Sequence, residues 1–165
     1  MLIVALISAI VMASAPMIMA KKEKYNVTAE YDVTVHASQN TTFTFVNGSF
    51  GDIRVGTNKT ISPTFYLTNN GTSDAVVFAK FETHKGKTYG LKSSPPPQVI
   101  PASNFKLGRT DRNMTALYDN GTEVQLAGTV PHNGTAYNYI AELYVPREQK
   151  PGEYDGTVQL TFANA

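Results

Sequence analysis

The sequence predicts an all-β protein, a β-sandwich or jelly-roll of roughly nine to ten strands preceded by a hydrophobic signal segment. Three observations carry this prediction. Apolar and polar residues alternate in short runs along most of the chain, Asn-Gly pairs separate several of these runs, and no stretch of ten or more residues after residue 20 has the apolar spacing of a helix. The chain has 165 residues, enough for one domain with a hydrophobic core.

The first 20 residues are apolar and uncharged, and they end in Ile18-Met19-Ala20 directly before Lys21 and Lys22. This is typical of a secretory signal peptide, so residues 1–20 are expected to be removed after Ala20. A retained transmembrane helix is one alternative, but the two lysines would then favour a cytoplasmic domain. A pilin-like core helix is the other, and Pro16 argues against it. We therefore expect an extracellular, cell-surface protein that meets the membrane only through this segment.

Residues 21–37 contain an alternating run that is long for a single strand. Its apolar positions are Tyr25, Val27, Ala29, Tyr31, Val33 and Val35. Polar residues occupy the positions between them, which is the pattern of a half-buried strand. Because the run follows the predicted cleavage site, it is a candidate donor strand that could insert into a neighbouring subunit. Pairing inside its own domain is the alternative, and both stay open here.

Further strands are expected in the sandwich domain, residues 38–165. They are 42–46, 52–55, 61–68, 74–83, 98–100, 114–118, 123–127, 137–145 and 154–162. Pro63 predicts an edge or bulged strand over 61–68, since proline cannot donate to a ladder. Asn-Gly pairs predict hairpin turns at Asn47-Gly48, Asn70-Gly71, Asn120-Gly121 and Asn133-Gly134.

Charge and composition exclude several classes of function. The formal net charge is +1, so the chain has no strong field to attract nucleic acid or an anionic membrane surface. It has no cysteine, which excludes disulfides and thiolate chemistry. His36, His84 and His132 do not have metal-ligand spacing. No motif implies catalytic residues, a metal or a cofactor, and a secreted hydrolase would need clustered acids or histidines that the sequence lacks. We expect a protein that is not an enzyme.

Acceptor motifs for N-glycosylation, Asn-x-Ser/Thr, are far more frequent than chance predicts. The eight candidate asparagines are Asn26, Asn40, Asn47, Asn58, Asn70, Asn113, Asn120 and Asn133. Thr-rich strands and Asn-rich turns raise the number of motifs expected by chance, but only to about three or four. N-linked glycans are thus expected partners, and dense glycosylation suits a permanently exposed coat component.

The chain also resembles the secreted β-sandwich subunits of archaeal surface structures, namely bundling pili, threads and sheaths. The resemblance rests on the signal segment, the absence of cysteine, the dense acceptor motifs and two short sequence segments. These are Leu67-Thr68-Asn69-Asn70-Gly71-Thr72 and the run from Val145-Pro146 to Pro151-Gly152-Glu153-Tyr154. It implies polymerisation in which each subunit donates its N-terminal strand to the next.

Two functional hypotheses follow. The first is a self-assembling structural subunit of an extracellular filament, pilus or sheath, whose partners are copies of itself. The second is a monomeric secreted adhesin or carbohydrate-binding module, in which Tyr137 and Tyr139 would stack on sugars. Cross-strand packing is the commoner role of such aromatic residues on strands.

Overall fold

The computed structural model describes residues 26–36, 40–83, 88–93 and 98–165. Nearly all the regular structure in these ranges is β. The strands are β1 (Asn26–Glu30), β2 (Asp32–His36), β3 (Thr41–Phe45), β4 (Ser49–Arg54), β5 (Asn58–Asn69), β6 (Ala75–Phe81), β7 (Gly90–Ser93), β8 (Val99–Pro101), β9 (Phe105–Arg109), β10 (Thr115–Ala116), β11 (Val124–Gln125), β12 (Ala136–Tyr144), β13 (Gly152–Asp155) and β14 (Thr157–Asn164). One short 3-10 helix, Ala102–Asn104, precedes β9. None of the residues described forms a helix with the length and apolar character that crossing a membrane requires.

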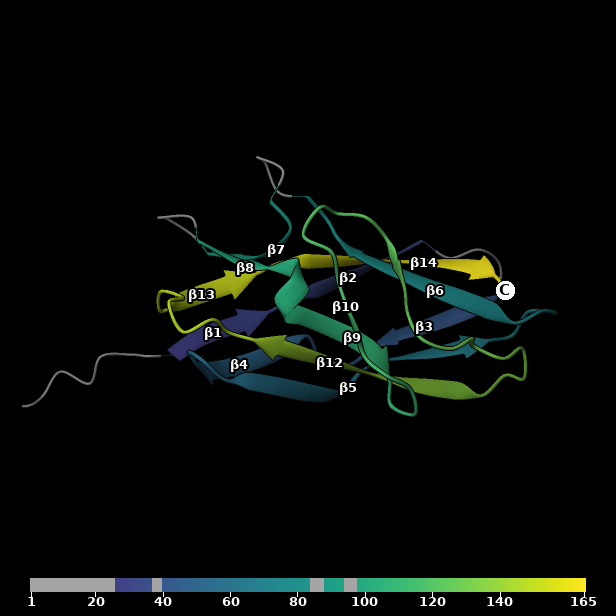
Figure 1. Cartoon of the computed structure of the whole chain (residues 1–165). Coiled ribbons are helices and arrows are strands. Elements are labelled where there is room, and N and C mark those ends of the chain that lie inside the picture. The colour runs from purple at the N-terminus through teal and green to yellow at the C-terminus, as the bar shows by residue number, and fades with distance from the viewer. Residues whose placement is uncertain (1–25, 37–39, 84–87, 94–97) are drawn as a thin grey trace, which may run out of the picture.

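The strands form three hydrogen-bonded sheets (Figure 1). Sheet I has the order β4-β1-β13-β7-β8, sheet II the order β10-β9-β12-β5-β3, and sheet III the order β11-β6-β14-β2. Side chains from all three meet in one core, since the ring of Phe105 on β9 packs edge-on against Phe81 of β6 and Phe50 of β4. This arrangement is consistent with a β-sandwich, so the predicted fold class is confirmed at that level.

Two long runs of the chain lie side by side and each contributes to two sheets. The run 26–36 divides into β1 and β2, and the run 152–164 divides into β13 and β14. β1 pairs parallel with β13 in sheet I, and β2 pairs parallel with β14 in sheet III. The sequence predicted each run as one strand, which was wrong: both change sheets in the middle, and the alternation of side chains continues across the change.

The remaining differences from the expected strands have local causes. β7 and β9 were not expected; β9 is short and contains Gly108, yet it lies between β10 and β12 in sheet II. β5 is not an edge strand, because it pairs with β12 on one side and β3 on the other. The bulge predicted from Pro63 is confirmed, since the β5–β12 register shifts between Ile61 and Phe65.

The Asn-Gly pairs do not close hairpins. Asn47-Gly48 joins β3 of sheet II to β4 of sheet I, and Asn70-Gly71 joins β5 of sheet II to β6 of sheet III. The other two pairs also lie between strands that do not pair with each other. Dipeptides that tolerate positive φ serve here as corners between sheets. The hairpin predictions at these four positions were therefore wrong.

Candidate functional site: the slot of the N-terminal strand

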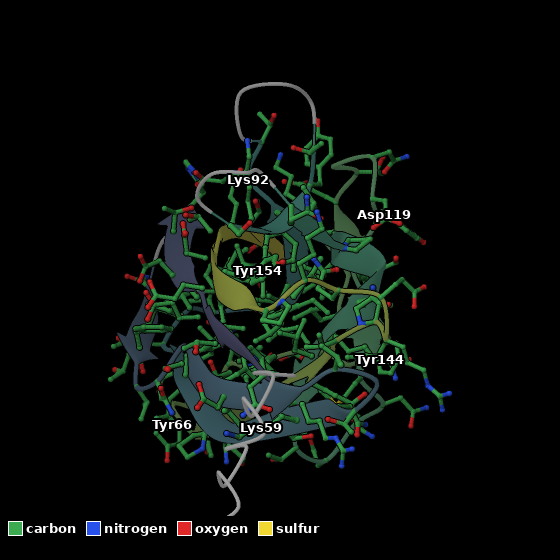
Figure 2. All side chains as sticks on the ribbon, turned by 90° about the vertical axis from the view of Figure 1, so that its left-hand side faces the viewer. Lys59, Tyr66, Lys92, Asp119, Tyr144 and Tyr154 are labelled. Atoms are coloured by element: carbon green, nitrogen blue, oxygen red, sulfur yellow. The ribbon has the colours of Figure 1, made fainter. Side chains whose placement is uncertain are left out.

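β1 fills a slot between two strands that come from distant parts of the chain. It pairs antiparallel with β4, where Thr28 lies opposite Asp52, and parallel with β13, where Ala29 lies opposite Tyr154. Figure 2 looks onto the end of the molecule at which β1 begins, with Tyr154 near the centre and Tyr144 at the periphery. Without β1, both β4 and β13 would present unpaired backbone groups. We call the space between β4 and β13 the slot.

The inward side chains of the N-terminal run are buried to different degrees. Val27 and Ala29 have no exposed surface and Tyr31 is 2% exposed. The polar residues between them on β1 are all exposed. The alternation in the sequence therefore predicted the correct buried face, and in this structure that face packs inside the chain's own domain.

The second half of the run is less enclosed. Val33 and Val35 are half-buried and pack against the core from β2. β2 lies at the edge of sheet III, with β14 as its partner. Tyr25, the first member of the predicted apolar set, lies outside the described residues.

The backbone of the run changes partners at Tyr31. Its amide N–H donates to the carbonyl of Gly48 at 2.9 Å, and the next amide, that of Asp32, donates to the carbonyl of Gly156 at 2.9 Å. Gly48 immediately precedes β4, and Gly156 separates β13 from β14. Between these two hydrogen bonds, the backbone pairing of the run changes from sheet I to sheet III.

The ring of Tyr31 lies in a cluster of aromatic side chains. It meets Phe105 edge-on with the ring centroids 4.9 Å apart, meets Phe45 edge-on at 6.2 Å, and lies tilted against Phe50 at 6.0 Å. Edge-to-face pairs at these distances add about 0.5–1.5 kcal/mol beyond the burial of apolar area. Tyr31 thus connects the N-terminal run to β3, β4 and β9.

The hydroxyl of Tyr31 has a buried partner. It contacts the hydroxyl of Thr64, a fully buried residue of β5. The Thr64 hydroxyl in turn donates to the carbonyl of Asn47 at 2.8 Å. Because Thr64 uses its proton on Asn47, Tyr31 is the donor to Thr64. Burial raises the pKa of Tyr31 above the ordinary tyrosine value, so this phenol stays protonated.

The two glycines at the change of sheets are closely packed, Gly48 against the run itself and Gly156 against β7. A Cβ atom on Gly48 would lie 1.8 Å from the carbonyl oxygen of Tyr31. A Cβ on Gly156 would lie 3.0 Å from the carbonyl oxygen of Gly90 and 3.1 Å from Leu91. The first contact is between backbones and cannot be relieved by a side-chain rotation, so position 48 requires glycine.

All eight asparagines of the acceptor motifs are exposed. They lie on β1, β5 and the connections between strands. Of the four asparagines outside such motifs, only Asn164 is exposed, whereas Asn69, Asn104 and Asn138 are buried or half-buried. At Asn47, Asn120 and Asn133 the side-chain oxygen accepts from the amide two residues later, at 2.8 to 3.0 Å. Exposure of the asparagine side chains therefore coincides with membership of an acceptor motif, with Asn164 as the exception.

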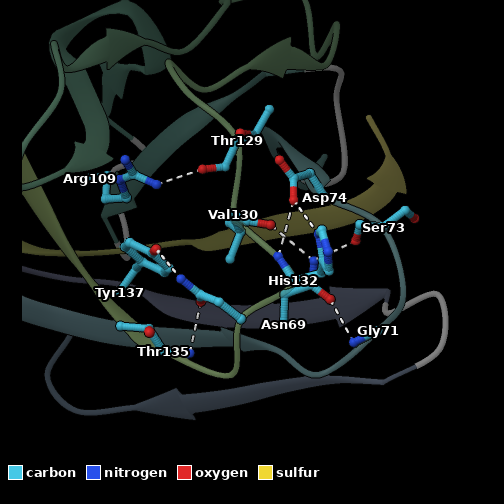
Figure 3. A network of polar contacts seen from close by, with 11 residues as sticks. Asn69, Gly71, Ser73, Asp74, Arg109, Thr129, Val130, His132, Thr135 and Tyr137 are labelled. Carbon is cyan, nitrogen blue, oxygen red and sulfur yellow. Dashed lines mark hydrogen bonds and ion pairs between the residues drawn. The ribbon is translucent and has the colours of Figure 1, made fainter.

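A polar cluster that the sequence did not indicate holds the segment between β11 and β12 against β5 and β6 (Figure 3). The guanidinium of Arg109 is nearly buried; it donates to both carboxylate oxygens of Asp111 and to the carbonyl of Thr129. It also lies 4.5 Å from the centre of the Tyr137 ring. The hydrogen bonds to Asp111 raise the pKa of Arg109 further. Each of the three guanidinium nitrogens donates within the fold, so the cluster stabilises the segment.

The second part of this network involves a histidine. Nδ1 and the amide of His132 approach the same carboxylate oxygen of Asp74, at 2.6 and 3.1 Å. The side-chain hydrogen bond from His132 lowers the pKa of Asp74. His36 is exposed on β2, and His84 lies outside the described residues. In the described part of the chain, no three His, Asp or Glu side chains are grouped so that they could hold a metal ion.

The tyrosines considered for sugar stacking are differently placed. Tyr139 is 2% exposed and stacks on Phe65 at 4.7 Å, so it cannot meet a ligand. Tyr137 is half-buried beneath Arg109. Packing, the commoner role of strand aromatics, therefore accounts for both. Tyr118 and Tyr144 are exposed instead, at 51% and 39%.

Comparison with models of known protein families gives no match, and a search of curated proteins gives none either.

Proposed function

We propose that this chain is a self-assembling structural subunit of an extracellular filament, pilus or sheath, joined by exchange of the strand 25–37 between copies. The observation that carries the proposal is the position of β1, which is hydrogen-bonded on both sides although it belongs to the first segment of the domain. The strand reaches the rest of the domain through residues 37–39, which lead from His36 to Asn40. The jelly-roll connectivity expected from the sequence stays part of this proposal.

An empty slot would be strongly unfavourable. Burying a side chain of the size of Val27 stabilises by about 1.5–3 kcal/mol, and Tyr31 buries a larger surface. The backbone groups of β4 and β13 that face β1 would also lose their partners. Some strand must therefore fill the slot, and the same residues from a second copy make the same contacts. Which copy supplies the strand then depends on protein concentration and on the connection from His36 to Asn40.

The short connection supports exchange. Only four residues separate the end of β2, an edge strand of sheet III, from the start of β3, an edge strand of sheet II, and short connections favour swapping of an element. A non-reciprocal exchange of this kind generates an open assembly unless rotation closes it into a ring.

The surface supports an extracellular, glycosylated coat. Eight acceptor asparagines are exposed, and a glycan at such a position meets solvent and costs the fold nothing. The adhesin alternative loses support, because Tyr139 is buried and no described residue that lines the polar pocket of about 360 Å³ beside Asn40 and Asn69 is aromatic.

Electron microscopy of the protein purified from its native cell surface tests the proposal. Regular fibres or tubes of this chain are expected, and dispersed single particles would contradict it. A variant pair locates the joint: Val27→Lys places a charge in the slot, whereas Thr28→Lys places the same charge on the exposed face of the same strand, opposite Asp52 and Glu153. We expect Val27→Lys to abolish assembly and Thr28→Lys to retain it.

A further inference from the structure

We infer that Tyr31 sets the register of the strand in the slot, so that the slot selects a strand with a tyrosine at this one position. The inference rests on the proposed function, since a strand accepted from a second copy would be held by the same contacts. The joint between subunits would then accept the strand of another copy of this chain in a single register.

Period-two alternation alone does not fix the register. A slip by one residue would turn every apolar side chain to the solvent, but a slip by two keeps the apolar face inward. Val27, Ala29, Val33 and Val35 are aliphatic and differ only in size. Among the described inward residues of the run, Tyr31 alone carries a polar group and an aromatic ring.

Two contacts at Tyr31 are lost on a slip by two. The phenol donates to the buried hydroxyl of Thr64, which no aliphatic side chain can do. The ring lies 4.9 Å from that of Phe105, and a valine or an alanine in its place would leave a cavity.

The neighbouring chain is shaped to this one register. The β1–β4 pairing shifts between Ala29 and Glu30, opposite Gly51 and Ser49, so that Phe50 is the extra residue of β4. Directly after the shift, the chain turns from sheet I to sheet III at Tyr31 through Gly48 and Gly156. In a strand slipped by two residues, Ala29 and Glu30 would no longer lie at the bulge, and Tyr31 would no longer lie at the turn. In an assembly, this fixes the depth of each inserted strand.

The test uses the absence of cysteine in the full chain. Asp52→Cys is combined with one cysteine on the exposed face of β1, in place of Asn26, Thr28 or Glu30. In the native register Thr28 lies opposite Asp52, so the 28–52 pair should form a disulfide and the other two should not. The unglycosylated protein is used, because the substitutions at Asn26 and Thr28 remove the acceptor motif of Asn26.

The decisive variant moves the tyrosine. Val27→Ala, Ala29→Tyr and Tyr31→Val together recreate the order Ala-x-Tyr-x-Val two residues earlier and lengthen the connection to Asn40. We expect the disulfide partner of position 52 to change from position 28 to position 26. A matched control, Val27→Ala with Tyr31→Val, lacks the moved tyrosine and should lose the selectivity. Retention of the 28–52 disulfide in the triple variant would overturn the inference.

A second measurement covers the case in which the triple variant does not fold. Tyr31→Phe and Thr64→Val each remove one hydroxyl of the buried pair. Their effects on the unfolding equilibrium should be coupled by about fivefold or more, whereas independent effects would overturn the inference. The disulfides report the register and the coupling reports the Tyr31–Thr64 contact, whether the strand comes from the same chain or another. Absence of disulfides between chains would therefore contradict strand exchange without touching the role of Tyr31.

Discussion

The phenol of Tyr31 donates a hydrogen bond to the hydroxyl of Thr64, 33 residues later in the chain. This bond joins the N-terminal run to the middle of β5 in a different sheet. It lies at the point where the run leaves sheet I for sheet III, and both residues are buried. The attachment of the N-terminal strand thus depends on a specific polar contact as well as on apolar burial.

Tyr31→Phe is expected to lower the free energy of unfolding by about 1–2 kcal/mol, because Thr64 loses a partner in a buried site. Chemical denaturation followed by tyrosine fluorescence or circular dichroism measures the change. Tyr144→Phe, at an exposed position, should change it by less than about 0.5 kcal/mol. Equal effects of the two substitutions would contradict a structural role of the buried hydroxyl.

Gly48→Ala is expected to destabilise the fold by about 2–4 kcal/mol, since the new methyl group collides with the backbone of Tyr31. Gly71→Ala is the comparison, because its nearest neighbour is a side-chain oxygen at 3.0 Å. Thermal and urea unfolding of both variants give the result. A Gly48→Ala protein as stable as the wild type would show that the strand can sit further from β4.

The buried tyrosines predict a loss of stability at high pH. Burial raises the pKa of Tyr31 and Tyr139 in the folded chain above the ordinary tyrosine value of 10.0. The two protonated phenols contribute fully to the free energy of unfolding below pH 10.0. This contribution is lost as the pH rises above 10.0, because the tyrosines of the unfolded state ionise first. Urea unfolding between about pH 9 and 11 measures the slope. Tyr31→Phe should make it shallower, whereas an unchanged slope would contradict burial of this phenol.

Much of the fold could be predicted from alternation alone. Runs such as 42–46 and 137–145 became β3 and β12 with almost the expected bounds. The division of 26–36 at Tyr31 could not be predicted, because the side-chain period continues unchanged while the hydrogen-bonding partners change. Partners come from remote segments, here β13 and β14, that no local pattern specifies.

The candidate site was predicted in part. The inward set Val27, Ala29 and Tyr31 followed from the period, but the partners of Tyr31 did not. Thr64 is one of many threonines, and its burial depends on the arrangement of β5 between two neighbours. Tyr139 was considered for sugar stacking because sequence does not distinguish a packed ring from an exposed one.

The glycosylation proposal predicts which asparagines carry sugar. Mass spectrometry of peptides from the native protein should find glycans at acceptor-motif asparagines such as Asn70 and Asn120, since all eight are exposed. Asn69 provides the internal comparison: it adjoins Asn70 but is buried and donates to the carbonyls of Ser73 and Val130. Unmodified asparagine at all eight positions would contradict a glycosylated coat.

The most direct test of strand exchange mixes two single-cysteine chains, Thr28→Cys and Asp52→Cys, under assembly conditions followed by oxidation. These positions lie opposite each other on β1 and β4, and Thr28 donates to Asp52 at 2.6 Å. If the strand passes between copies, disulfides between the two kinds of chain should form, and the Thr28→Cys/Asp52→Cys double variant should give a ladder of covalent oligomers. If the double variant instead forms only an internally linked monomer, the strand stays in its own domain and the proposed joint is wrong.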